Sequence, residues 1–273
     1  MKKLFEIVPN LSEGRKAATI EAACAAVEGT GARLIDWSSD HVHHRSVLTV
    51  VGDEAQVLEA AIRLAGVALE HIDLRGHRGV HPRIGALDVL PFVPLADATL
   101  EEAAALAHRA GSEIWQRYRV PSYYYGAAAR QPERLLLPEL RRNADWLPDE
   151  GDVRRHLSAG AIAIGARGVL IAFNVELASG DVAAARAIAR AIRERDGGLR
   201  SLRALALPRG DGRVQVSLNV TDYVATPLYR VVELIKRLAA ERGIEISGCE
   251  LVGCVPFAAV ESAAAYYLGV TTL

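Results

Sequence analysis

Cysteine is scarce in this sequence: three occur among 273 residues, at Cys24, Cys249 and Cys254. So low a number excludes a small scaffold held together by disulfides and is typical of a protein from a reducing compartment. The last two stand in the apolar context GCELVGCVPF, which predicts that they pack in a core rather than bind a metal.

Long apolar runs and an excess of charge are absent as well. No stretch approaches the roughly 20 uninterrupted apolar residues of a membrane-spanning helix, and the N-terminal MKKLFEIVPN turns polar before such a run forms. We therefore expect no membrane partner and a cytoplasmic location. A formal net charge of -1 argues against a general nucleic-acid binder. The 51% hydrophobic content suffices for one large or two medium domains.

The most distinctive stretch is residues 75–95, RGHRGVHPRIGALDVLPFVPL. A cationic loop here precedes an apolar run that predicts a buried strand, which is a common way for a fold to present reactive groups. His81 is the first candidate for chemistry, because Gly79 before it and Pro82 after it break any helix. The alternative is that these basic residues form only a solvated loop.

Hydrophobic periodicity predicts the order βαββαβ for the first half of the chain. Strands are expected at residues 3–8, 33–37, 46–51 and 86–95, and helices at 13–27 and 53–73, with Ser12 and Asp53 as N-caps. A helix at 100–119 and an aromatic strand at 122–125 extend this half. Residues 131–156 lack periodicity and predict a long surface segment with one helical turn.

The second half repeats this order. Strands are expected at residues 168–177, 202–207, 213–220 and 245–252, and helices at 181–194, 226–241 and 258–267. The order βαββαβ is typical of the split-βαβ, ferredoxin-like unit. The sequence therefore predicts an α+β fold of two ferredoxin-like α/β-sandwich subdomains, residues 1–170 and 171–273. A cleft or tunnel between them is expected to be the ligand site.

Three polar loops, residues 9–14, 38–45 and 75–83, are expected to meet at one edge of the first sheet. They would bring together several arginines and five histidines: His41, His43, His44, His77 and His81. Two interpretations stay open. The first three of these histidines, beside Asp40, form a ligand set suited to Zn²⁺, Fe²⁺ or Ni²⁺. The preferred alternative is metal-free acid-base chemistry on an anionic substrate, with histidine exchanging protons and arginine binding carboxylates.

Aromatic side chains are expected in packing roles. Neighbouring residues of a strand point to opposite faces, so the run of three tyrosines favours core packing over a platform for a flat ligand. These residues are Tyr123, Tyr124 and Tyr125. The tryptophans are expected to pack as well, and they are Trp37, Trp115 and Trp146.

Several segments together resemble the formiminotransferase family. VPNLSEG at residues 8–14 is close to that family's VPNFSEG, and HPRIGALDVLPFVP at 81–94 is similar to its HPRMGALDVCPFIP. Further matching segments are VPSYYYGAAAR, ADWLPDEG, GARGVLIAFNVEL and ELVGCVPF. They follow one another over nearly the whole chain, so the combination is specific.

The resemblance implies a fold, a reaction and partners. It implies two α/β subdomains, a homodimer and a folate-binding tunnel between the subdomains. It also implies transfer of the formimino group from N-formimino-L-glutamate to tetrahydrofolate, a co-substrate, during histidine degradation and without a metal. The products would be 5-formiminotetrahydrofolate and L-glutamate.

Particular residues acquire roles through this resemblance. The family's catalytic histidine falls on His81, which would act as general base and then as general acid. The family's folate-contacting loop falls on residues 151–160, and the candidates there are Gly151, Arg155, His156 and Gly160. Candidates for binding the substrate carboxylates and orienting the formimino group are Asn10, Arg45 and Arg83.

The chain also departs from the family pattern. His44 stands where the family usually has Asn, and Ser38 replaces an acidic residue, with Asp40 as a candidate substitute. A family segment containing Gly-Glu-Tyr-Glu is absent between Arg142 and Asn143. Two alternatives therefore stay open: a related folate enzyme resembling 5-formyltetrahydrofolate cyclo-ligase, and a folate-binding protein without turnover.

Overall fold

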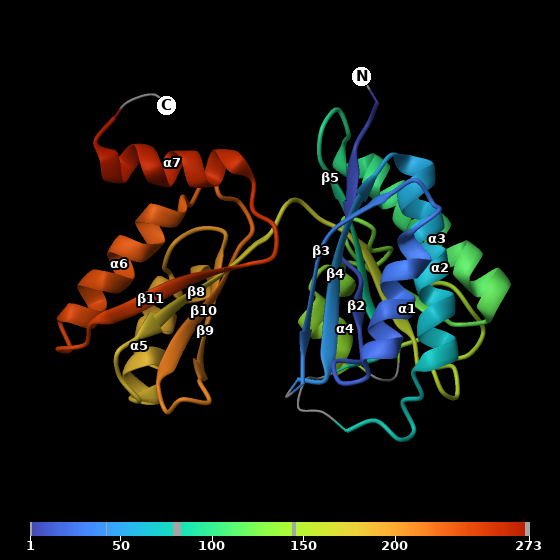
Figure 1. Ribbon diagram of the computed structural model, residues 1–273, viewed down its shortest axis with the longest axis horizontal. Coiled ribbons are helices and arrows are strands. Elements are labelled where there is room, and N and C mark those ends of the chain that lie inside the picture. Colours follow the sequence, from blue (N-terminus) through green and yellow to red (C-terminus); the bar gives the residue numbers. More distant parts are fainter. Residues whose placement is uncertain (1, 42, 79–82, 144–145, 271–273) are drawn as a thin grey trace. The chain divides into compact units, whose positions relative to one another are not determined.

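The apolar runs of the sequence form two separate sheets in the computed structural model, which describes residues 2–41, 43–78, 83–143 and 146–270 (Figure 1). The sheets belong to two compact units, residues 1–168 and 169–273. Each unit combines helices and strands around its own buried apolar core, which confirms the predicted α+β class. None of the described helices is long and apolar enough to cross a membrane.

One mixed sheet forms the centre of the first unit. Its strands are β1 (Phe5–Ile7), β2 (Asn10–Leu11), β3 (Arg33–Asp40), β4 (Arg45–Gly52), β5 (Leu87–Pro94), β6 (Ser122–Gly126) and β7 (Ile162–Ala166). Across the sheet they follow the order β3, β4, the β1/β2 pair, β5, β7 and β6. Only Val8 and Pro9 separate β1 from β2. Each of these two strands pairs antiparallel with β4 and with β5. They therefore act as two pieces of one N-terminal strand.

Helices cover one face of this sheet (Figure 1). These are α1 (Ala17–Val27), α2 (Glu54–His71) and α3 (Leu100–Tyr118), and their apolar residues share the main core with Phe5, Leu48 and Leu90 of the strands. The opposite face carries a smaller cluster that includes Leu140. Leu140 belongs to α4 (Leu137–Arg142), which follows the short 3-10 helix η1 (Pro132–Arg134). These two elements supply the helical turn predicted within the surface segment.

The three tyrosines of β6 pack as predicted. Tyr124 is fully buried in the main core, and its hydroxyl donates a hydrogen bond to the carbonyl of His108 at 3.0 Å. Tyr123 and Tyr125 lie in the cluster on the opposite face. The prediction for Trp37 is wrong, because this side chain is 50% exposed. It belongs to β3, which lies at the edge of the sheet and pairs with β4 alone.

Strand β7 has no counterpart in the sequence prediction. It lies between β5 and β6, pairs in parallel with both, and is buried along its whole length. A strand buried on both faces shows a short apolar run instead of alternating polarity. The run Ile-Ala-Ile-Gly-Ala therefore lacks alternation, and at five residues it is shorter than the apolar run of β5, from which a buried strand was predicted.

The second unit is built on a fully antiparallel sheet. Its elements are β8 (Ile171–Leu177), α5 (Val182–Ile192), η2 (Glu194–Asp196), β9 (Leu202–Pro208), β10 (Val214–Val220), α6 (Leu228–Ala240), β11 (Ile246–Val252) and α7 (Phe257–Leu268). The strands follow the order β11, β8, β10, β9. Core packing of Cys249 and Cys254 is a wrong prediction, since both are exposed. The reason for Cys249 is that β11 is an edge strand, exposed over its C-terminal half.

Only one of the two predicted N-caps is confirmed. The Asp53 carboxylate accepts the Gln56 N–H at 3.1 Å, and the Gln56 side-chain oxygen accepts the Asp53 N–H at 2.9 Å. This is a reciprocal capping box. Ser12 does not cap α1, because its hydroxyl donates to the carbonyl of Gly85 at 2.7 Å and the helix begins only at Ala17.

Removing the confirmed cap is expected to weaken the first unit. Asp53→Ala leaves an N–H of the first turn of α2 without an acceptor and should lower the free energy of unfolding by about 1 kcal/mol. Asp53→Asn keeps a side-chain oxygen at the same place and should lose only a few tenths of that amount. Urea denaturation followed by circular dichroism measures both variants. Equal losses in the two would contradict the capping role.

Candidate functional site

The three polar loops of the first unit converge, as the sequence predicts. His77 lies in the loop that follows α2, and its Nε2 is 2.8 Å from the carbonyl oxygen of Ser12. From the same loop, Arg83 Nη2 donates to the carbonyl of His43 at 3.3 Å. Arg15 Nε donates to the carbonyl of His41 at 2.9 Å. At one edge of the sheet, side chains thus contact backbone carbonyl oxygens of loops that are distant in sequence.

Glu13 organises the first of these loops. Its buried carboxylate accepts the N–H groups of Gly14, Arg15 and Lys16 at 2.9, 2.8 and 3.1 Å. Burial by itself raises the pKa of Glu13, but the backbone hydrogen bonds outweigh it and the pKa is lowered below its ordinary value. The carboxylate therefore stays ionised, and it holds the chain in the turn that precedes α1.

Two imidazoles stack beside this turn. The ring centroids of His44 and His77 lie 4.1 Å apart with 30° between the ring planes. The Gly14 N–H donates to His44 Nδ1 at 3.1 Å, and Arg83 donates to His77. Burial lowers the pKa of both histidines, and the neighbouring Arg83 lowers it further. Burial and the neighbouring cations therefore favour neutral imidazoles, whereas Glu13 opposes them at His44.

Asp88 links the polar loops to the sheet. It lies at the start of β5, is 2% exposed, and accepts the Ile84 N–H at 2.6 Å. Arg141 from α4 forms an ion pair with the same carboxylate. Asp88 also acts electrostatically on Arg45 and Arg83, whose pKa values are lowered mainly by burial. Cationic side chains from three elements therefore surround one buried carboxylate.

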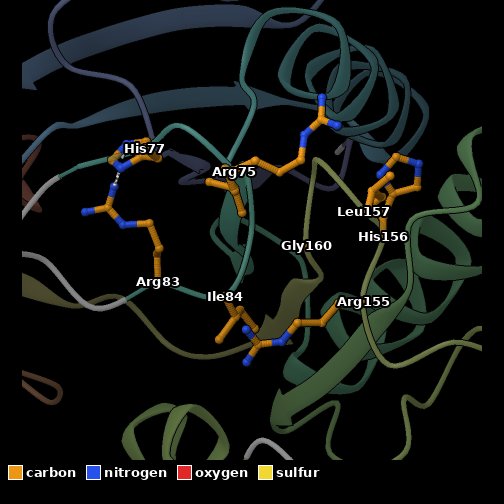
Figure 2. A pocket seen from close by; sticks show the side chains of 9 residues that line it. Arg75, His77, Arg83, Ile84, Arg155, His156, Leu157 and Gly160 are labelled. Carbon is orange, nitrogen blue, oxygen red and sulfur yellow. Dashed lines mark hydrogen bonds between the residues drawn. The ribbon is translucent and has the colours of Figure 1, made fainter.

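A cavity of about 540 Å³ opens beside this cluster. Its described lining consists of Leu74, Arg75, His77, Arg83, Ile84, Arg155, His156, Leu157 and Gly160. In Figure 2, His77 and Arg83 lie on one side of the cavity and His156 and Leu157 on the other, with Gly160 between them. None of these nine lining residues carries a carboxylate, so the cavity suits an anionic ligand.

The charge of Arg75 is partly engaged within the protein. Its Nε donates to both oxygens of Asp73, at 2.9 and 3.0 Å. The hydrogen bonds from Arg75 lower the pKa of Asp73 to about 2. A ligand would therefore meet Arg75 as one half of an exposed ion pair, whereas Arg83 and Arg155 face the cavity from opposite chain segments.

Backbone hydrogen bonds place the loop 151–160 against the segment around Ile84. The Ala161 N–H donates to the Ile84 carbonyl at 2.9 Å, and the Leu74 N–H donates to the Ser158 carbonyl at 2.9 Å. The hydroxyl of Tyr123 also lies 3.1 Å from the Arg154 carbonyl oxygen. The position of the loop is thus set by β7, by β6 and by the segment that enters β5.

Four of the site residues expected from sequence line the cavity: Arg83, Arg155, His156 and Gly160. Three others do not. Asn10 is 5% exposed and donates from Nδ2 to the Val8 carbonyl at 2.7 Å. Arg45 belongs to the cluster around Asp88, and Gly151 lies against Trp115 and Pro121. His81 falls outside the described residues.

The histidines considered as metal ligands face different partners. His43 Nδ1 lies 2.8 Å from Asp40 Oδ2, whereas His44 Nδ1 lies 3.2 Å from Glu13 Oε1. Within the described ranges, no group of three or more His, Cys, Asp or Glu side chains is placed to hold a metal ion.

Sequence reasoning missed Glu13, Asp88 and Arg141. Asp88 carries a usable signal, because it is the single charged residue within the apolar run GALDVLPF, and a buried charge requires partners. Arg141 gives no comparable signal: it is one of many arginines in a segment without periodicity. Only the packing of α4 on the sheet brings it to Asp88.

Taken together, the lining combines cationic side chains with the imidazoles of His77 and His156, which suits the class of proteins that bind an anionic ligand. The particular family follows from comparison with known proteins. The N-terminal subdomain of the formiminotransferase domain matches residues 4–167, and the formiminotransferase domain matches residues 172–273. The chain belongs to the formiminotransferase family.

Individual relatives agree over nearly the full length of the chain. A glutamate formimidoyltransferase of Streptococcus pyogenes serotype M1 is 38% identical, covering 99% of this chain and 95% of the relative. One of Thermoplasma acidophilum is 39% identical, covering 97% and 92%. The formimidoyltransferase-cyclodeaminase of Rattus norvegicus is 38% identical over 98% of this chain, which spans 53% of that longer protein.

Gly160 tests how tightly the cavity wall is packed. Its φ is +70°, and a Cβ added at this position would lie only 2.2 Å from the Ile84 carbonyl oxygen, so there is no space for a side chain. Gly160→Ala is therefore expected to lower the free energy of unfolding by at least about 1 kcal/mol. Gly168→Ala is the matched control, because its Cβ would meet nothing within 4 Å. Urea titrations of both variants that show equal effects would contradict this packing.

Proposed function

We propose that this protein transfers the formimino group from N-formimino-L-glutamate to tetrahydrofolate, giving 5-formiminotetrahydrofolate and L-glutamate. The observation that carries the proposal is the 38 to 39% identity to two glutamate formimidoyltransferases, which extends over more than nine tenths of each relative. The protein is accordingly a transferase. The cationic cavity agrees with this function, because formiminoglutamate and the glutamate tail of folate both carry carboxylates.

The reaction exchanges one carbon–nitrogen bond for another. N5 of tetrahydrofolate attacks the formimino carbon and loses a proton, and the bond from that carbon to the glutamate nitrogen breaks as this nitrogen gains a proton. The oxidation state of the carbon does not change, and tetrahydrofolate is a co-substrate because it keeps the transferred group. On the basis of the family we expect no metal. One imidazole is sufficient to take the first proton and return the second. We assign this role to His81.

The binding roles follow from the charges around the cavity. Arg83 lines the cavity and is assigned to a carboxylate of formiminoglutamate. Arg45, in the cluster around Asp88, and the buried Asn10 are assigned to the same substrate and to orienting its formimino group. The loop 151–160 is assigned to folate, through Arg155, His156 and the backbone at Gly151 and Gly160. Paired guanidinium forks suit carboxylates better than single ammonium groups do.

The wider setting is also proposed on the basis of the family. We infer a cytoplasmic homodimer that acts in histidine degradation. Two alternative functions are a non-catalytic folate-binding protein and a folate enzyme resembling 5-formyltetrahydrofolate cyclo-ligase. His44 stands next to Arg45 where the family usually has Asn, and this difference bears on which amino-acid substrate is used.

A direct assay separates these functions. Purified protein mixed with N-formimino-L-glutamate and tetrahydrofolate is expected to form 5-formiminotetrahydrofolate and equimolar glutamate, followed by chromatography of the folate product. Folate binding without product would support the binding protein instead. Turnover of 5-formyltetrahydrofolate with ATP, and none of formiminoglutamate, would support the cyclo-ligase-like enzyme.

The acid-base role of His81 has its own test. His81→Ala is expected to lower turnover by roughly 100-fold or more while leaving the affinity for folate nearly unchanged, as for other positioned proton-transfer groups. His71→Ala is the control, because His71 lies at the exposed end of α2. Steady-state kinetics and fluorescence titration with folate measure both effects. Activity retained in His81→Ala would exclude the assigned role.

A further inference from the structure

Both ring nitrogens of His77 are engaged. Nε2 lies 2.8 Å from the carbonyl oxygen of Ser12, which can only accept a hydrogen bond, so Nε2 carries the proton. The Arg83 guanidinium approaches both ring nitrogens through Nη1. Because Nε2 carries the proton, Nδ1 is the ring nitrogen that can accept from it. The Ser12 carbonyl thus selects the tautomer, and a neutral imidazole leaves a lone pair on Nδ1 for the neighbouring Arg83.

His44 supports the position of the His77 ring by stacking on it. It stacks on His77 at 4.1 Å, and its own Nδ1 accepts the Gly14 N–H at 3.1 Å. Gly14 belongs to the turn held by the Glu13 carboxylate, and Ser12 immediately precedes that turn. This loop sets the tautomer of His77 through the Ser12 carbonyl, whereas His44 Nδ1 meets both the Gly14 N–H and, at 3.2 Å, the Glu13 carboxylate.

We propose that His77, stacked on His44, is a positioning residue that holds the Arg83 guanidinium at the wall of the cavity only while both imidazoles are neutral. Protonation of His77 places a hydrogen on Nδ1, which removes the acceptor and sets a cation against Arg83. The consequence for binding rests on the proposed function, in which Arg83 receives a carboxylate of formiminoglutamate.

The charged groups around the pair determine the direction of the pH effect. His77 faces Arg83, His44 and Glu13, and His44 faces Glu13, Arg15, Lys16 and Arg83. Burial and the cations favour the neutral rings, whereas Glu13 favours protonation. The net pKa of each ring lies below the ordinary value of 6.5. Arg83 is therefore held in place at neutral pH and released as the pH falls through the lowered pKa of the pair.

This device predicts a pH dependence in KM for formiminoglutamate, separate from the dependence of kcat on the catalytic base. In the unchanged protein, 1/KM should fall on the acid side. His77→Ala should raise KM at pH 7.5 by about tenfold, the effect of losing one hydrogen bond to a charged group. His77→Gln should recover most of that affinity, because its carboxamide donates to Ser12, accepts from Arg83 and does not titrate.

Steady-state kinetics between pH 5.5 and 8.5 test this prediction. The acid limb of 1/KM is expected to disappear in His77→Gln and to persist in the control variant His71→Gln. The same acid limb in His77→Gln as in the unchanged protein would overturn the proposal, as would a KM in His77→Ala equal to that of the unchanged protein.

A second measurement does not depend on turnover. NMR titration of the imidazole carbons, assigned with His77→Gln and His44→Asn, should give His77 a pKa below 6.5. This pKa should rise in Arg83→Gln, which removes the adjacent cation, and in His44→Asn, which keeps an acceptor for Gly14 but removes the stacked ring. A His77 pKa at or above 6.5, or one unchanged in Arg83→Gln, would overturn the proposal. If these titrations behave as expected but no product forms at any pH, the proposed function fails instead.

Discussion

The buried carboxylate of Asp88 is the interaction on which the polar end of the first unit depends. At the start of β5 it accepts the N–H of Ile84 and binds Arg141 of α4. A carboxylate at this depth is stable only while it is hydrogen-bonded and paired. It therefore ties three things to the sheet: the segment that leaves the histidine loop, the helix on the opposite face, and the positive charge of the neighbouring arginines. The cavity opens directly beside this point.

The cavity wall is made of backbone as much as of side chains. Ile84 and Leu74 exchange hydrogen bonds with the segment 158–161, and Gly160 closes the approach because it has no side chain. On this rigid frame the polar side chains have few alternatives, and the preference for neutral imidazoles at His44 and His77 follows from burial among cations. The frame thus favours the neutral form of these two histidines.

Particular elements show how far sequence reasoning reaches. The loops around Ser12, His44 and His77 were expected to meet, because the predicted strand order places all three connections at the same edge of the sheet. The strand β7 was not expected, because its five-residue apolar run is short and shows no alternation of polar and apolar residues. Ser12 illustrates a third case: its type and position favour an N-cap, but its hydroxyl donates to the Gly85 carbonyl instead. Four of the expected site residues line the cavity, whereas Arg45 acts within the cluster behind it.

The sequence by itself determined the α+β class, the order of most elements and the family, since these depend on local periodicity and on motifs read in order along the chain. Only the tertiary structure decided which charges meet. Arg141 reaches Asp88 across 53 residues, and Ser12 reaches His77 across 65. Protonation and hydrogen bonding depend on such non-local distances and on burial. For that reason the neutral state of the histidine pair and the orientation of Arg83 depend on the fold and cannot be predicted from the sequence.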